Sequence, residues 1–316
     1  MNILVTGAAG FIGSALAKTL LEQGHKVIGL DNFNEYYDVT LKRQRVAVLL
    51  PQLTLIEGDI TDSDLLESVL TDHAVDVVCH LAAQAGVRYS VEAPEVYVDT
   101  NVRGTQALFE AMRKHRVQRM VFASTSSVYG TDTVAPFSET APADRPVSVY
   151  AATKRAGELL AHTYYSLYGI ETTCLRFFTV YGPWSRPDMA MLKFAEKISN
   201  NKPIDIYNNG DLQRDFTYID DIVRGFTLAV EKPLGFEIIN LGNGSPVKLL
   251  DFVSMLEAEL GISADKKLLP MQQGDVYETY ADTTKAKTLL GFSAQTTFTV
   301  GVKRFVDWYH EYRTSL

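Results

Sequence analysis

Short apolar runs recur through the first half of the chain, and stretches with helical spacing separate them. The runs cover residues 2–6, 26–30, 53–57, 75–81, 119–123 and 171–177. Helical spacing covers residues 11–23, 62–70, 95–115 and 149–168. The runs do not alternate between apolar and polar residues, which is typical of parallel strands buried on both faces. The pattern therefore predicts an α/β protein with a doubly wound parallel sheet.

The pattern changes after about Tyr181, where Gly182, Pro183 and Trp184 interrupt it. Shorter elements follow, separated by loops rich in Asn, Gly and Pro. Helical spacing returns near residues 188–199, 220–232, 248–260 and 298–313. We expect a first domain over 1–180 and a smaller α/β lobe over 181–316, with the chain crossing between them.

Composition and charge narrow the class of protein. With 316 residues and 46% hydrophobic content, the chain can bury a large core. The net charge of −8 disfavours nonspecific binding to nucleic acid or to anionic membranes. No apolar run is long enough to span a bilayer, and the N-terminus opens directly into a strand. A cytoplasmic location is therefore the default expectation.

The two cysteines, Cys79 and Cys174, lie in apolar stretches, and neither has a Cys-x-x-Cys partner. A chain of this size does not need a disulfide to fold. We expect two buried, reduced thiols and no metal site.

Three glycines, Gly7, Gly10 and Gly13, lie between the first strand and the helix that follows it. Glycines permit a tight turn and let the backbone approach a pyrophosphate, which then faces the N–H groups of the helix N-terminus. Such a trio alone is a weak signal, but its strand–turn–helix setting is the one that the mechanism requires. The segment predicts a dinucleotide-binding turn.

Asp31 ends the second strand. A carboxylate at this position binds the ribose hydroxyls of NAD and would repel the 2′-phosphate of NADP. The nearest arginine, Arg43, lies well downstream. The sequence therefore favours NAD over NADP.

Tyr150 and Lys154 are placed to lie on one face of a predicted helix. A free tyrosine has a pKa of about 10, and a nearby ammonium group lowers it. Tyr150 could then accept a proton from a substrate hydroxyl. The Tyr-x-x-x-Lys spacing is also common by chance, and Tyr164, Tyr165 and Tyr168 on the same helix are interpreted as packing or interface residues.

The glycine spacing and a series of later motifs resemble the extended short-chain dehydrogenase/reductase superfamily, and within it the NAD-dependent epimerase/dehydratase family. The resemblance covers essentially the whole chain. The motifs are Gly58-Asp59-Ile60, Leu81-Ala82-Ala83-Gln84, Asn101-Val102-Arg103-Gly104-Thr105, the segment from Thr125 to Gly130, and Tyr150 with Lys154.

The resemblance implies a Rossmann-type sheet and an NAD site. The residues that it assigns to the cofactor are Gly7, Gly10, Phe11, Ile12, Gly13, Asp31, Asn32, Asp59, Ile60, Ala82, Ala83, Asn101, Tyr150 and Lys154. It also makes Thr125 a third catalytic residue, whose hydroxyl would bond to the reacting sugar oxygen. A strand-end hydroxyl bonded to backbone is the alternative for Thr125.

The segment after Thr125 separates three reactions that share oxidation at C4 of a sugar. Related dehydratases and decarboxylases carry a carboxylate there, whereas this chain has Ser126 and Ser127. The family resemblance therefore favours simple epimerisation.

Local similarities at residues 85–90, 177–183 and 184–189 resemble the UDP-glucuronate 4-epimerases. They imply interconversion of UDP-glucuronate and UDP-galacturonate through a 4-keto intermediate, commonly for surface polysaccharides. The implied substrate-binding residues are Arg88, Ser126, Ser127, Thr179, Arg186 and Arg214. We expect the three hydroxyls to hold the sugar carboxylate, and Arg186 and Arg214 to contact the diphosphate.

Several alternatives stay open. A UDP-glucose or UDP-N-acetylglucosamine 4-epimerase shares the same machinery, and a noncatalytic NAD-binding scaffold shares the fold. The resemblance also implies a homodimer formed through the helices near 95–115 and 149–168. Gln272 and Gln273 stand in a loop where many relatives carry arginine, so the role of that loop is open.

Overall fold

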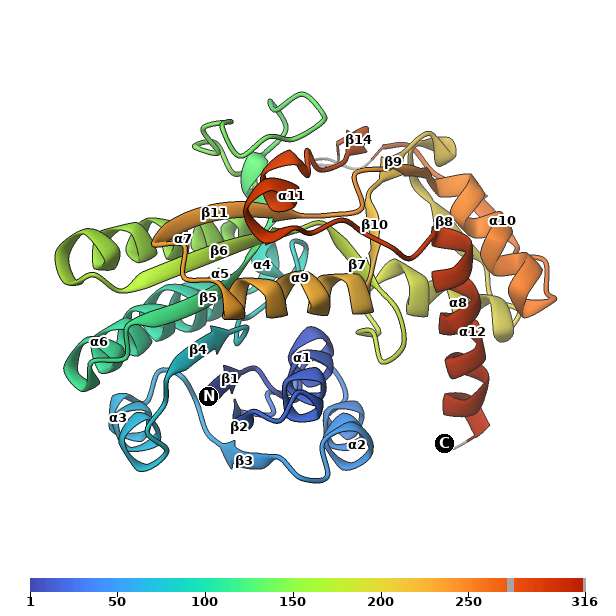
Figure 1. The fold of residues 1–316 in the computed structure, drawn as a ribbon. Coiled ribbons are helices and arrows are strands. Elements are labelled where there is room, and N and C mark those ends of the chain that lie inside the picture. Colours follow the sequence, from blue (N-terminus) through green and yellow to red (C-terminus); the bar gives the residue numbers. More distant parts are fainter. Residues whose placement is uncertain (272–275, 315–316) are drawn as a thin grey trace.

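The computed structural model describes residues 1–271 and 276–314, and its central feature is a seven-stranded sheet (Figure 1). The strand order is β11-β6-β5-β4-β1-β2-β3, and every neighbouring pair is parallel. The strands are β1 (Asn2–Thr6), β2 (Lys26–Asp31), β3 (Thr54–Glu57), β4 (Val77–His80), β5 (Arg119–Thr125), β6 (Glu171–Phe177) and β11 (Phe236–Leu241). The predicted parallel sheet is confirmed.

Helices cover both faces of this sheet (Figure 1). One face carries α1 (Phe11–Glu22) and α9 (Ile219–Glu231), and the other carries α3 (Ser63–Asp72), α6 (Thr105–His115) and α7 (Val149–Tyr168). Adjacent residues of β1 pack into different hydrophobic cores. Ile3 belongs to the core that includes residues of α1, and Leu4 belongs to the core that includes residues of α6. Because both faces are buried, the strands contain apolar residues without alternation, and the sheet is doubly wound.

The elements that were not predicted include α2 (Val39–Leu49), α11 (Thr284–Leu290) and strand β11. β11 pairs with β6 at the edge of the main sheet, and α9 contacts α1. Residues after 180 therefore supply a strand and a helix to the sheet layer, and a division of the chain at residue 180 stays a prediction.

The remaining C-terminal elements surround a short parallel pair, β7 (Thr179–Tyr181) and β10 (Phe216–Tyr218). The helices are α8 (Ala190–Ser199), α10 (Leu249–Leu260) and α12 (Phe298–Thr314). The small strands are β8 (Ile204–Ile206), β9 (Gln213–Arg214), β12 (Val247–Lys248), β13 (Lys266–Leu268) and β14 (Glu278–Thr279). The rings of Phe216, Phe252 and Phe298 lie 5.1–6.0 Å apart and form the centre of this region.

The helical stretch predicted near 95–115 is not one regular α-helix. After α4 (Tyr89–Glu92), it divides into α5 (Pro94–Tyr97), a π-helical segment (Val98–Gly104) and α6. π-Helical segments inside helices are frequent at functional sites. Asn101 lies within this one.

Cys79 and Cys174 are both buried free thiols, as expected. Within residues 1–271 and 276–314, no helix combines the length and apolar character that a membrane crossing needs. The same residues contain no cluster of three or more His, Cys, Asp or Glu side chains that could hold a metal ion.

Candidate active site

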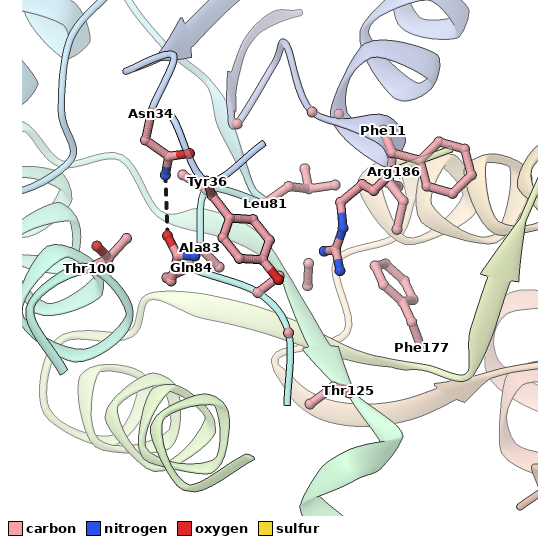
Figure 2. A pocket seen from close by; sticks show the side chains of 18 of the residues that line it. Phe11, Asn34, Tyr36, Leu81, Ala83, Gln84, Thr100, Thr125, Phe177 and Arg186 are labelled. Carbon is pink, nitrogen blue, oxygen red and sulfur yellow. Dashed lines mark hydrogen bonds between the residues drawn. The ribbon is translucent and has the colours of Figure 1, made fainter. Parts of the chain in front are cut away.

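A cavity of about 380 Å³ lies where β1, β2, β4, β5 and β6 reach their carboxyl ends (Figure 2). In parallel α/β sheets, ligands bind in the crevice at these strand ends. Many of the predicted site residues line it: Gly7, Gly10, Phe11, Ile12, Gly13, Asp31, Asn32, Ile60, Ala82, Ala83, Thr125, Tyr150, Lys154, Thr179 and Arg186. Six others do not: Asp59, Arg88, Asn101, Ser126, Ser127 and Arg214.

The glycine-rich turn is packed so closely against the chain's own backbone that larger side chains would collide with it. A Cβ atom added at Gly7 would lie 2.8 Å from the Ala82 nitrogen, and one at Gly13 would lie 2.1 Å from the Gly7 oxygen. Gly7 also has a φ of +72°, which favours glycine. No side chain caps the N-terminus of α1 at Gly10. The helix N-terminus therefore meets the cavity as an anion-binding surface for a pyrophosphate.

Backbone hydrogen bonds hold Asp31 at the rim of this turn. Its Oδ2 accepts from Ala9 N at 3.0 Å, and its Oδ1 accepts from Phe33 N at 2.9 Å. Asn32 donates from Nδ2 to Asp59 Oδ2 at 2.7 Å, so Asp59 supports Asn32 from outside the cavity. This arrangement fits a cofactor ribose.

Tyr150 and Lys154 lie in the first turns of α7, which begins after Ser148. The Ser148 hydroxyl accepts a hydrogen bond of 3.1 Å from Ala151 N and caps the helix. Lys154 is 3% exposed, and its Nζ lies 4.2 Å from the centre of the Phe122 ring. Helix α7 therefore brings the predicted pair to the cavity.

The cavity shifts the pKa of both members of this pair. Burial lowers the pKa of Lys154 to about 8, and the Glu158 carboxylate opposes this by raising it. Burial raises the pKa of Tyr150, whereas the Arg186 charge and a hydrogen bond with Thr125 lower it. The Arg186 charge and the Thr125 hydrogen bond therefore offset part of the effect of burial on the pKa of Tyr150.

Thr125 ends β5 and lines the cavity. Its Oγ1 accepts from Ser127 N and donates to Ser127 Oγ, both at 3.2 Å. Thr125 thus contacts local groups and also Tyr150. Ser126 and Ser127 begin the 3-10 turn that follows and stay predictions as substrate ligands.

Asn101 acts outside the cavity, as a bridge. Its Oδ1 accepts from Gln84 N at 2.8 Å, and its Nδ2 donates to Gln84 O and to Thr153 Oγ1, both at 3.0 Å. Thr153 directly precedes Lys154. The amide therefore ties the loop after β4 to the helix that carries the pair.

The three predicted substrate arginines differ in position. Arg186 reaches into the cavity and pairs with Asp188 at 2.9 and 2.8 Å (Figure 2). Arg88 packs over the Tyr207 ring at 5.3 Å, and Arg214 donates to Gln213 O at 2.8 Å. Gln272 and Gln273 lie outside the described residues.

Sequence reasoning missed Tyr36, Lys42 and Gln84, which also line the cavity. Lys42 Nζ donates to Asn34 O and Oδ1 at 2.9 Å, and Gln84 Oε1 accepts from Asn34 Nδ2 at 3.3 Å (Figure 2). Gln84 directly follows Ala82 and Ala83, which is a signal that could have identified it. Lys42 had no such signal, because the helix that carries it was not predicted.

Known proteins match this chain over nearly its whole length. Residues 3–242 match the NAD dependent epimerase/dehydratase family. A UDP-glucuronate 4-epimerase from Thermodesulfobacterium geofontis is 46% identical over 311 residues, which are 98% of this chain and 96% of that protein.

Solved structures of related enzymes also match this chain over nearly its whole length. UDP-glucuronic acid 4-epimerase from Bacillus cereus, in complex with UDP-glucuronic acid and NAD, is 40% identical with a TM-score of 0.91, covering 99% of this chain and 100% of that one. UDP-glucose 4-epimerase from Thermotoga maritima, with UDP-glucose, is 33% identical with a TM-score of 0.92, at 99% and 100% coverage. The chain belongs to the NAD-dependent epimerase/dehydratase family.

Proposed function

We propose that this chain is a UDP-glucuronate 4-epimerase that uses bound NAD to interconvert UDP-glucuronate and UDP-galacturonate. One observation carries the choice of reaction. Of the described residues that line the cavity, Asp31 alone has a carboxylate, and it lies at the glycine-rich turn rather than beside Tyr150. Elimination of water from a keto sugar needs an additional acid and base, so the lining favours epimerisation over dehydration.

The chemistry assigned to the chain is proton transfer at one oxygen. Tyr150 takes the proton of the sugar 4-hydroxyl, with Thr125 hydrogen-bonded to the same oxygen. The Lys154 ammonium stabilises the resulting phenolate charge. When bound, NAD supplies a reversible hydride acceptor for C4. The 4-keto sugar turns over before reduction, and Tyr150 returns the proton to the new hydroxyl.

Arg186 supports the choice of an acidic sugar. Arg186 lines the same cavity as Tyr150 and Thr125, and its charge lowers the pKa of Tyr150. Glucuronate carries its carboxylate on C5, next to the reacting C4. This position favours contact between Arg186 and the carboxylate over the diphosphate role predicted from sequence.

The hydroxyls of Ser126, Ser127 and Thr179 have a complementary role in the proposal. After C4 is oxidised, the substrate is a β-keto acid, which loses carbon dioxide readily when the breaking bond is perpendicular to the carbonyl plane. Thr179 lines the cavity, and Ser127 contacts Thr125 at 3.2 Å. Hydroxyls here can bind the carboxylate away from that alignment without adding charge.

Competing substrates provide the test of specificity. We expect kcat/KM for UDP-glucuronate to exceed that for UDP-glucose and UDP-N-acetylglucosamine by about 100-fold or more, because a neutral sugar lacks the carboxylate that Arg186 and the nearby hydroxyls would bind. Equal turnover of UDP-glucose would favour the neutral-sugar alternative. A noncatalytic scaffold would exchange no label between C4-deuterated substrate and the bound cofactor.

We also propose a homodimer formed through α6 and α7, in the cytoplasm, supplying UDP-galacturonate for polysaccharide synthesis. The exposed face of α7 supports the dimer: Leu159 is 55% exposed and Leu167 is 65% exposed. Sedimentation velocity should give a dimer mass for the wild type and a monomer for Leu159→Glu. A monomeric wild type would contradict the dimer without affecting the proposed reaction.

A further inference from the structure

Arg45 is fully buried on α2 and joins three separate segments of the chain. Its Nη1 donates to Ala9 O at 3.1 Å and to Tyr37 Oη at 2.7 Å. Its Nε and Nη2 both donate to Trp184 O, at 3.0 and 2.8 Å. Ala9 belongs to the glycine-rich turn, and Trp184 belongs to the loop 182–188, which carries Arg186. One guanidinium therefore connects the cofactor turn to the substrate arginine.

The acceptors of Arg45 argue against a role in stability alone. The hydrogen bonds of this guanidinium go to neutral carbonyl and hydroxyl oxygens, which are Ala9 O, Tyr37 Oη, Trp184 O and Ser185 O. Burying a charge without an opposite charge costs more than burying an apolar side chain of similar volume. What the arginine provides is a rigid, planar set of donors that fixes several acceptors at once.

The loop that Arg45 holds has a strained backbone. Trp184 has a φ of +63°, a conformation that residues with side chains rarely adopt. Its carbonyl is fixed by the two Arg45 donors, while its indole packs 5.5 Å from Trp308 and 6.1 Å from Tyr312. Arg186 follows two residues later and lines the cavity. The direction in which Arg186 leaves the loop therefore depends on how Trp184 is held.

We propose that Arg45 is a positioning residue that seats the loop 182–188 on the glycine-rich turn and thereby aims Arg186 at the sugar. The chain of contacts continues to the cofactor side, because Ala9 N also donates to Asp31 Oδ2 at 3.0 Å. Arg45 thus links the ribose-binding carboxylate to the substrate-binding guanidinium. The role of Arg186 in this inference rests on the proposed function.

Tryptophan fluorescence tests the placement of the loop without any substrate. The chain has two tryptophans, so Trp308→Phe leaves Trp184 as the single reporter. In that background, we expect Arg45→Met to raise the acrylamide quenching constant of Trp184 by about twofold, because the loop loses its anchor. Arg45→Lys keeps the charge and should give an intermediate value. Unchanged quenching in folded Arg45→Met protein overturns the inference.

Arg119→Met is the matched control. Arg119 also donates to a backbone carbonyl, Val230 O at 2.6 Å, but it begins β5 at the opposite end of the sheet. The Arg119→Met variant should leave the acrylamide quenching constant of Trp184 unchanged. A similar increase in both variants would show a general loosening of the fold and would also overturn the inference.

A double-mutant cycle then tests the link to Arg186. We expect Arg45→Met to raise the KM for UDP-glucuronate by about tenfold, with a smaller effect on kcat, and Arg45→Lys to recover part of it. Arg45→Met should add almost nothing to the KM of Arg186→Met, because its effect passes through that side chain. Additive effects contradict the link. If the wild type does not turn over UDP-glucuronate, the proposed function fails, while the quenching experiment still decides the role of Arg45.

Discussion

Ser124 Oγ donates a hydrogen bond of 2.6 Å to Oε1 of Glu158, and this contact joins the end of β5 to α7. Arg176 binds both oxygens of the same carboxylate, at 2.9 and 2.8 Å. Glu158 is fully buried and lies one helical turn beyond Lys154. The cluster therefore supports the strand that ends at Thr125 and places a negative charge near the catalytic lysine.

Glu158→Gln should narrow the pH range of activity. The reaction needs Lys154 in its charged form, and the pKa of Lys154 is lowered to about 8 by burial and raised by Glu158. Removing the carboxylate charge therefore moves the loss of kcat/KM at high pH to a lower pH, measured as a pH–rate profile. Arg155→Met is the control, because it removes a partner of Glu158 Oε2 at 2.8 Å and keeps the carboxylate. If the loss of kcat/KM at high pH occurs at the same pH in Glu158→Gln as in the wild type, this prediction is wrong.

Loss of the Lys154 proton at high pH should raise the free energy of unfolding, whereas it should lower activity. Its pKa is about 8 in the folded chain against an ordinary value of 10.5. Between these values the unfolded chain binds more protons, so this group makes the free energy of unfolding rise with pH. Denaturant titrations from pH 8 to 10.5 should show a smaller rise in Lys154→Met than in the wild type. Equal slopes would show that the lysine pKa is not lowered.

Tyr150→Phe should lower kcat by about 10² to 10⁴-fold, since it removes the group that transfers the proton. The ring is retained, including its edge contact with Tyr97 at 6.1 Å, so the amount of bound NAD should not change, and the lost hydrogen bond with Thr125 should change the free energy of unfolding by only about 1 kcal/mol. Tyr168→Phe is a control near the exposed end of the same helix and should stay fully active. Residual activity above a tenth of wild type would exclude Tyr150 as the main proton acceptor.

Asn101→Ala should destabilise the fold without touching the cavity directly. The change leaves the Gln84 N–H and C=O groups without their side-chain partner, at a cost of about 1–3 kcal/mol in the free energy of unfolding. It also removes the hydrogen bond between the π-helical segment and Thr153 Oγ1, so kcat should fall as well. Asn200→Ala, which removes an exposed amide bond to Glu196 O, is the surface control and should match the wild type.

The combined variant Ser126→Ala, Ser127→Ala and Thr179→Ala tests control of the carboxylate. Without these hydroxyls, we expect a UDP-pentose to form beside the epimer, or the KM for UDP-glucuronate to rise. Chromatography of the nucleotide sugars separates the products, and Thr131→Ala serves as an exposed hydroxyl control. A variant with wild-type KM and no pentose would remove these residues from the account.

The parts of the fold that were predicted from sequence depend on local patterns. β1, β2, β4, β5 and β6 are short, almost wholly buried apolar strands, so their residues identify them. β11 was missed although it is no less apolar than β6, because it lies beyond residue 180, in the part of the chain that was assigned to a separate lobe. The helix α2 was missed because its buried face is formed by Leu41, Lys42 and Arg45 rather than by an apolar stripe.

The residues of the candidate site also differ in whether local spacing or long-range packing sets their position. Gly7, Gly13, Tyr150 and Lys154 are set by spacing within one turn or one helix, so the sequence placed them in the cavity. Which arginine reaches the substrate depends instead on long-range packing. The sequence named Arg186 among three candidate arginines, but it could not show that Arg45 holds the Trp184 carbonyl two residues earlier.

Analysis of the products formed from UDP-glucuronate separates epimerisation from decarboxylation and dehydration. Purified protein is incubated with UDP-glucuronate, and the nucleotide sugars are separated and identified while absorbance reports any release of reduced cofactor. We expect an equilibrium mixture of UDP-glucuronate and UDP-galacturonate, with no pentose and no net NADH. A UDP-pentose as the main product, a dehydrated sugar, or no turnover with NAD bound would contradict the account.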